Sequence, residues 1–242
     1  MNISPETLDI LRNFSSINSG LTVKAGNELK TVSAMKNIFA RAVVSENFDK
    51  EHSIYDLSEY LGAVSLFDSP NFEFIAEKVT VSEGDNSVQY YYADPQMVIS
   101  PQKDITMPEA EISFDIDEGI LDSLLKASSV LSLPDMVLSS DGSTVVLTVK
   151  DKKNSTSNTF SKTVAQGNGS TYEMFLRMEN IKVIPGDYTV FVSSQGIAQF
   201  TNRKQAVEYF IALEPDSNYT GSCLLYTSDA ADEGLGVDLG GR

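Results

Sequence analysis

Histidine, cysteine and tryptophan are almost missing from this 242-residue sequence, which has one histidine, one cysteine and no tryptophan. The single cysteine, Cys223, excludes an internal disulfide framework and is typical of a reducing compartment. One cysteine and one histidine also exclude a zinc site built from the usual ligands. The histidine, His52, lies in a polar run, and we interpret it as an ordinary solvated side chain.

Signals for catalysis and for membrane insertion are missing as well. No run of 18 apolar residues is present, so we expect no membrane-spanning segment. The start of the sequence lacks the features of a signal peptide, so we expect none. The acidic residues are scattered and do not form pairs suited to acid–base catalysis. Asp115–Gly119 departs from the spacing of a calcium loop, and Gly167–Gly169 lacks the phosphate-loop pattern. We therefore predict a protein that is not an enzyme and uses no metal or cofactor.

Positive charge is scarce. The chain has 18 Lys and Arg against 34 Asp and Glu, which gives a formal net charge of −16. Such acidity argues against ordinary nucleic-acid binding, which needs a basic surface. A ring that encircles DNA escapes this objection, because topology retains it and only its inner wall has to be basic. The position of the basic residues therefore matters more than their number.

A repeat is the main feature that the sequence does have. Each half opens with an amphipathic helix, Ser4–Ser16 in the first and Asp117–Ser129 in the second, and a short apolar strand follows each helix. Each half continues with β-rich sequence, a second short helix and further strands. We predict these short helices over Ser53–Phe67 and Arg177–Ile184. The predicted fold is a duplicated α+β unit with helices on one side and sheets on the other.

Local signals support these assignments. Ser4 is a good N-cap for the first helix, Pro5 suits its first turn, and Asp117 can cap the helix that opens the second half. Asp141–Gly142 separates two apolar runs, which predicts a β-hairpin.

The chain divides at residues 95–109, which hold three prolines and no clear hydrophobic period. We interpret this stretch as an extended connector between an N-terminal domain, residues 1–94, and a C-terminal domain, residues 110–219. Residues 220–242 are predicted to be a non-native or disordered tail, because the string after Gly221 resembles a translated sequencing adapter; a genuine acidic tail is the alternative. Residues 223–242 hold four acidic residues and one arginine, so the rest of the chain keeps a net charge of −13.

Four basic residues fall on the polar sides of the predicted helices: Arg12, Lys126, Arg177 and Lys182. They are candidates for ligand contacts, and ordinary solvated positions are an equal alternative. The run Tyr90–Tyr92 could stack on bases, but tyrosine suits amphipathic positions, so we favour an edge strand that is half core and half interface.

Several segments follow one another in a distinctive order and spacing. They are Leu11–Gly20, Ile54–Leu57 with Leu61–Gly62 and Ser65–Leu66, Ala93–Pro95, Pro185–Tyr188, and Ala212–Glu214. Together they resemble the sliding clamps of T-even-type bacteriophages, which are DNA polymerase processivity factors. The resemblance covers residues 1–218.

The resemblance implies an α+β fold like that of the proliferating cell nuclear antigen. Each subunit would have two tandem clamp domains, and three subunits would close into a homotrimeric ring with helices lining the hole and antiparallel sheets outside. The clamp would encircle duplex DNA and tether the phage DNA polymerase, whose C-terminal peptide docks in an apolar pocket near the connector. Further implied partners are an ATP-dependent clamp loader and late-transcription factors, for which the clamp is a mobile activator. The implied location is the cytoplasm of the infected bacterial host, away from any membrane.

The resemblance also implies roles for single residues. Arg12 and Lys126 fall where the family has basic residues on its inner helices, and Lys182 falls at a basic position before the Pro-Gly turn. Ser129 stands where a second basic residue is expected, which predicts a weaker wall there. We add Arg177 to the predicted DNA-facing residues.

Two further surfaces are implied. The predicted partner-peptide pocket consists of Val98, Ile99 and Leu213. The predicted subunit interface joins two edge strands of neighbouring subunits, namely Tyr90 and Tyr92 on one strand and Tyr172 and Phe175 on the other.

Two rival classes of protein share parts of this pattern. A trimeric, β-rich structural protein of the virion, such as a baseplate or fibre adaptor, would also be acidic, poor in cysteine and repetitive. A small hydrolase would need a nucleophile–base pair, which the single histidine disfavours.

Overall fold

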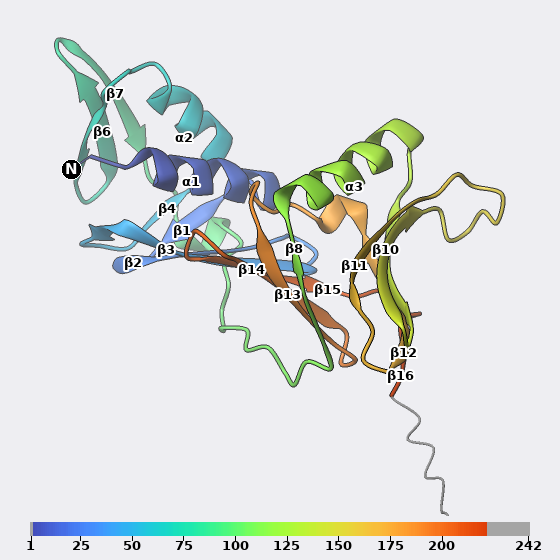
Figure 1. The fold of residues 1–242 in the computed structure, drawn as a ribbon. Coiled ribbons are helices and arrows are strands. Elements are labelled where there is room, and N and C mark those ends of the chain that lie inside the picture. The colour runs from blue at the N-terminus through green and yellow to red at the C-terminus, as the bar shows by residue number, and fades with distance from the viewer. Residues whose placement is uncertain (1, 222–242) are drawn as a thin grey trace, which may run out of the picture.

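The helices lie on one side of the two large sheets. The computed structural model describes residues 2–221; nearly all of the predicted tail, from residue 222 on, lies outside this range. The three α-helices of the described residues, α1 (Pro5–Ile17), α2 (Leu57–Val64) and α3 (Glu118–Leu131), lie along one side, and the large sheets lie beneath them (Figure 1). The α+β fold predicted from the sequence is confirmed.

The strands divide between the two halves of the chain. The N-terminal half contributes β1 (Leu21–Val23), β2 (Gly26–Val32), β3 (Ile38–Phe48), β4 (His52–Ile54), β5 (Asn71–Phe74), β6 (Lys78–Glu83) and β7 (Asn86–Tyr91). The C-terminal half contributes β8 (Ile112–Ile116), β9 (Asp135–Asp141), β10 (Thr144–Lys150), β11 (Phe160–Gln166), β12 (Thr171–Arg177), β13 (Tyr188–Ser193), β14 (Ile197–Asn202), β15 (Val207–Ala212) and β16 (Asn218–Thr220).

The repeat seen in the sequence is also a repeat of strand order. In the C-terminal half, α3 is followed by strands that pair in the order β11-β10-β9-β12, and β13, β14 and β15 pair in sequence. In the N-terminal half, α1 is followed by the pairs β2-β3 and β1-β4, and β5, β6 and β7 pair in sequence. Strands β1, β2, β3 and β4 therefore correspond to β9, β10, β11 and β12, and β5, β6 and β7 correspond to β13, β14 and β15.

One sheet joins the two halves. Its strand order is β2-β3-β15-β14-β13-β8, and its central antiparallel pair, β3 and β15, places Ala42 opposite Val207 and Ile38 opposite Ile211. These four side chains are buried, and the core runs without interruption from one half into the other. Because this sheet crosses between the halves, the domain limits predicted from the sequence stay a prediction.

The short helices differ from the sequence prediction. The predicted helix over Ser53–Phe67 begins later, because His52–Ile54 pair as β4 with β1 and the Asp56 side chain then accepts from the Glu59 amide as an N-cap. The predicted helix over Arg177–Ile184 is wrong: Arg177 ends β12, and only a three-residue 3-10 turn, η2 (Met178–Asn180), follows. The Met178 amide donates to Pro134 O, which prolongs strand-like pairing where the helix was expected.

Both opening helices begin where the sequence indicated. The Ser4 hydroxyl accepts from the Thr7 amide at the start of α1, and Asp117 precedes α3. Strands β9 and β10 form the predicted hairpin, and Gly142 at its turn has a φ of 95°, which favours glycine. Residues 95–109 contain no strand, only the 3-10 turn η1 (Pro95–Met97).

Candidate nucleic-acid and partner surfaces

Two of the predicted DNA-facing residues lie on the helical side. Arg12 of α1 and Lys126 of α3 are largely exposed, with 56% and 72% of their side chains accessible. Each is paired with a carboxylate one turn earlier on its own helix: Arg12 with Asp9 and Lys126 with Asp122, both at 2.6 Å. Each opening helix thus carries one ion pair between an aspartate and a basic residue on its polar face.

The helices themselves are acidic. Across α1, α2 and α3 the sequence holds five acidic residues and two basic ones. A carboxylate partner weakens the attraction of a cation for phosphate, and both helical cations have one. The helices alone therefore do not build the basic surface that was expected of this side.

Arg177 was predicted to lie on a helix and face DNA. It lies instead at the end of β12, where its Nη1 is 3.0 Å from Oδ1 of Asp135, a side chain with only 1% exposure. Asp135 also accepts from the Lys152 amide. A buried carboxylate needs such partners, so the structure gives Arg177 a role in the sheet.

Lys182 joins the two halves. Its Nζ donates to Ser16 O at 2.6 Å, at the C-terminal end of α1, where the helix has no basic residue of its own. A cation at this end of a helix binds the free carbonyls and opposes the negative end of the helix dipole. Asn13 of α1 donates back to Lys182 O and accepts from the Tyr209 hydroxyl, so the contact is reciprocal.

The predicted peptide pocket is not assembled by any contact that the structure describes. Val98 and Leu213 are buried, whereas Ile99 has 48% exposure. Asn18 donates to Ile99 O at 2.7 Å, which fixes the connector against the end of α1, and the Leu213 amide donates to Gly196 O. The three residues stay a prediction as a pocket.

The predicted interface strands differ in their surroundings. Tyr90 lies on β7, which is an edge strand of the sheet β5-β6-β7, as expected. Tyr92 is the first residue after the end of β7. Tyr172 and Phe175 lie on β12, which has β9 on one side and β16 on the other, so the expectation of an edge strand is wrong for them. The edge strands of the sheet that contains β12 are β11 and the three-residue β16.

The single histidine is not solvated as predicted. His52 belongs to β4, has 8% exposure and lies among aromatic rings, and this burial lowers its pKa. Residues 2–221 hold no group of three or more ligand side chains that could bind a metal ion. Within the same residues, no helix is long and apolar enough to cross a membrane.

Two remote carboxylates that the sequence analysis missed position the opening helices. Glu46 of β3 accepts from the Ser4 amide and the Thr7 hydroxyl at the start of α1. Asp187 accepts from the Glu118 amide at the start of α3, at 3.0 Å. The Pro185–Tyr188 segment contains Asp187, but only the folded chain shows which helix it caps.

Comparison with known proteins adds to this geometry. Two family models match: "DNA polymerase processivity factor" over residues 4–100 and "gp45 sliding clamp, C terminal" over residues 113–215. The sliding clamp of Vibrio phage KVP40 is 29% identical over 221 residues, which cover 88% of this chain and 99% of the relative. The sliding clamp of Enterobacteria phage T4 is 28% identical over 228 residues, covering 90% and 99%.

Solved structures share the fold. The proliferating cell nuclear antigen (PCNA) of A. fulgidus, solved with the C-terminal region of FEN-1, matches with a TM-score of 0.65 at 15% identity, covering 87% of this chain and 96% of that one. The PCNA of Entamoeba histolytica matches with a TM-score of 0.63 at 12% identity, covering 86% and 94%. At these identities the likeness concerns the fold alone.

Proposed function

The chain belongs to the sliding clamps of T4-like phages, and from this premise we propose that three copies close into a ring around duplex DNA. The family consists of processivity factors that are scaffolds and not enzymes. The clamp would tether the phage DNA polymerase through the polymerase's C-terminal peptide, raising the effective concentration of the polymerase at the primer end.

The contact inside the chain supports the ring. Strand β3 of the first half pairs with β15 of the second, and by the repeat these strands correspond to β11 and β7. Both β7 and β11 are open edges, largely exposed, whereas most of β3 and β15 is buried. Pairing of β11 with β7 of the next copy would repeat the internal junction and would cover two edges that otherwise invite aggregation.

Retention by topology fits the acidic helices. A closed ring needs no strong contact with phosphates, and weak contacts permit sliding. Arg12 and Lys126, each shared with an aspartate, would make salt-sensitive and sequence-independent contacts of this kind. Lys182 is already bound to α1, so its contribution to DNA contact would be small.

Further partners follow from the same membership. An ATP-dependent clamp loader would open the ring, and late-transcription factors would use the sliding ring as a mobile activator. The polymerase peptide would dock near the connector. The C-terminal region of FEN-1 is bound to A. fulgidus PCNA, which is a precedent for a C-terminal segment held by this fold. All of this would take place in the cytoplasm of the infected host.

Electron microscopy of the purified chain tests the ring. Closed particles of three subunits, with a hole wider than a DNA duplex, are expected. Solid trimers or elongated particles would favour a structural protein of the virion and would contradict the proposal.

A pair of proline variants tests the junction. Successive amides of a strand point to opposite edges, so of Ser161→Pro and Lys162→Pro one breaks the β10–β11 ladder and the other only the open edge. The variant that keeps its unfolding temperature is expected to lose the ring in native mass spectrometry. Rings that persist in this variant would place the interface elsewhere.

A further inference from the structure

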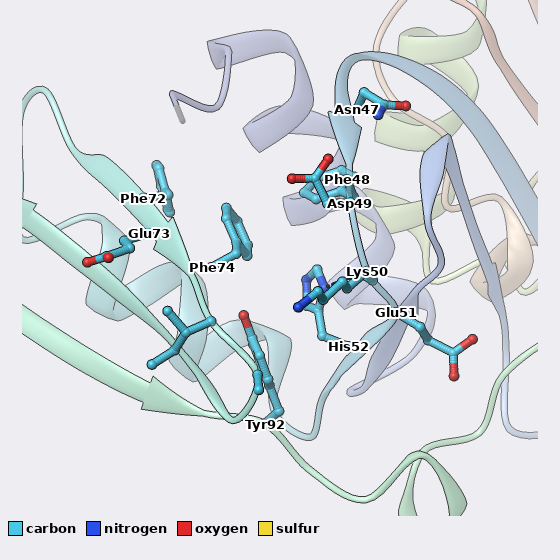
Figure 2. A pocket seen from close by; sticks show the side chains of 12 residues that line it. Asn47, Phe48, Asp49, Lys50, Glu51, His52, Phe72, Glu73, Phe74 and Tyr92 are labelled. Atoms are coloured by element: carbon cyan, nitrogen blue, oxygen red, sulfur yellow. Dashed lines mark hydrogen bonds between the residues drawn. The ribbon is translucent and has the colours of Figure 1, made fainter.

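A cavity of about 400 Å³ opens in the N-terminal half, between the end of β3, β4 and the β5–β6 hairpin (Figure 2). Its aromatic walls are Phe48, His52, Phe72, Phe74 and Tyr92. None of the connector-pocket residues predicted above lines it. It is therefore a surface separate from the predicted peptide pocket.

Four of the rings form a contiguous wall. His52 contacts the other three members, with ring centroids 4.9 Å from Tyr92, 5.3 Å from Phe74 and 5.8 Å from Phe48. Phe48 and Phe74 meet edge to face at 5.8 Å. Phe48 and His52 are almost fully buried and form the fixed back of the wall, whereas the half-buried Phe74 and Tyr92 are its accessible rings. The wall therefore offers the accessible π surface of Phe74 and Tyr92 to the cavity.

The Tyr92 hydroxyl is unsatisfied. Its oxygen is buried and has no hydrogen-bond partner in the described part of the chain. In Figure 2 it points between His52 and Phe74. Burial raises the pKa of Tyr92 to about 12, so the phenol stays neutral and keeps both a donor and an acceptor. A buried hydroxyl without a partner is unfavourable, and a ligand that supplies one removes that cost.

Charged residues around the cavity are mostly acidic. Asp49, Glu51 and Glu73 line it, against one lysine, Lys50. Figure 2 shows the Asp49 carboxylate turned toward the space in front of Phe74, while Glu51 and Glu73 point outward. The surrounding field therefore favours a cation over an anion.

We propose that this cavity binds the guanidinium group of an arginine on a partner protein. A planar guanidinium stacks on aromatic faces and is attracted by their negative quadrupole. Its N–H groups can donate to the exposed Asp49 carboxylate and, once the half-buried Tyr92 ring turns toward the ligand, to its hydroxyl. A purely apolar anchor would leave the hydroxyl unsatisfied, and an anionic one would be repelled by the acidic rim.

The single histidine makes a direct test available. In untagged full-length protein, the imidazole signals in a ¹H–¹³C spectrum come from His52 alone. Titration with the peptide acetyl-Gly-Arg-Gly-amide should shift them. The same peptide with citrulline, which keeps the shape but not the charge, should bind about tenfold more weakly.

Variants locate the contact. Tyr92→Phe removes only the unsatisfied hydroxyl, so the fold should be retained and the affinity for the arginine peptide should fall about fivefold. Asp49→Asn should also weaken binding, whereas the matched control Asp85→Asn, in the distant β6–β7 turn, should not. Equal shifts with the citrulline peptide, or unchanged affinity in Tyr92→Phe, would overturn the proposal. Stronger shifts with acetyl-tryptophan-amide would overturn it in favour of an apolar anchor.

Discussion

The helices α1 and α3 correspond in the repeat but are packed very differently. Helix α1 buries Thr7, Ile10, Leu11, Phe14 and Ile17, whereas the slightly longer α3 buries only Leu121 and Leu124. When Asp9 is aligned with Asp122, Ile17 corresponds to Val130, and their exposures are 6% and 81%. A similar sequence pattern therefore leads to a core helix in one half and a half-covered helix in the other.

The second helix of each half accounts for this difference. Helix α2 packs against α1, but its counterpart η2 is a single turn and leaves α3 without a neighbour of that kind. A groove of about 460 Å³ lies between α3 and residues 183–186. The repeat thus preserved strand order better than helix packing, because sheet hydrogen bonds fix register while a helix only needs an apolar face to cover, although β1 and β2 lie in separate sheets where β9 and β10 share one.

The largest expected loss of stability comes from truncating a buried side chain of the better-packed helix, α1. Phe14 is fully buried in α1, so Phe14→Ala should lower the free energy of unfolding by about 3–5 kcal/mol. Val130→Ala on α3 should change it by less than about 0.5 kcal/mol, since that side chain is exposed. Urea unfolding followed by circular dichroism measures both, and equal losses would mean that the two helices are packed alike.

The next effect concerns the helix starts. Burial by itself would raise the pKa of Glu46, but hydrogen bonds from Thr7 and Ser4 lower it below its ordinary value of 4.5. A carboxyl with a lowered folded-state pKa stabilises the protein above that ordinary value, and this stabilisation is lost as the pH falls through the folded-state pKa.

Glu46→Gln should therefore cost about 1–2 kcal/mol at pH 7 and much less under acidic conditions. Asp117→Ala, at the N-cap of α3, should cost less, because this residue makes no side-chain hydrogen bond to the helix. Unfolding curves at pH 7 and at acidic pH give the comparison, and a pH-independent loss for Glu46→Gln would rule out the charged contact.

A smaller effect is expected at the helix ends. Lys182→Met removes the amine that binds Ser16 O, which should cost about 0.3–1 kcal/mol. Helix α3 ends on its own left-handed Ser132, with the Ser128 hydroxyl donating to Leu133 O, and has no such dependence. Hydrogen exchange of the last turn of α1, but not of α3, should accelerate; acceleration in both would contradict a local role.

The smallest effect on stability should come from the two polar-face pairs. Arg12→Gln and Lys126→Gln each remove an exposed ion pair, so unfolding should change by less than about 0.5 kcal/mol. The slope of log affinity against log salt is negative. If both cations touch phosphates, each variant should make this slope less steep by about 0.9 for clamp-bound DNA. An unchanged slope in one variant alone would show that only the other helix faces DNA.

The sequence by itself determined the repeat, the α+β class, the opening helices, the hairpin at Asp141–Gly142 and the family. These rest on local signals, such as hydrophobic period, N-caps and turn residues, and on segments in order along the chain. Local chemistry decides them before distant parts of the chain meet.

Only the tertiary structure decided which residues serve the surfaces. Arg177 pairs with buried Asp135, Lys182 caps α1, and His52 joins an aromatic wall with Tyr92. Each of these contacts joins residues about 40 to more than 160 positions apart, and no local pattern encodes them. Whether a strand is an edge likewise depends on which distant strand pairs with it, so β12 could not be told from β11 until the sheets were assembled.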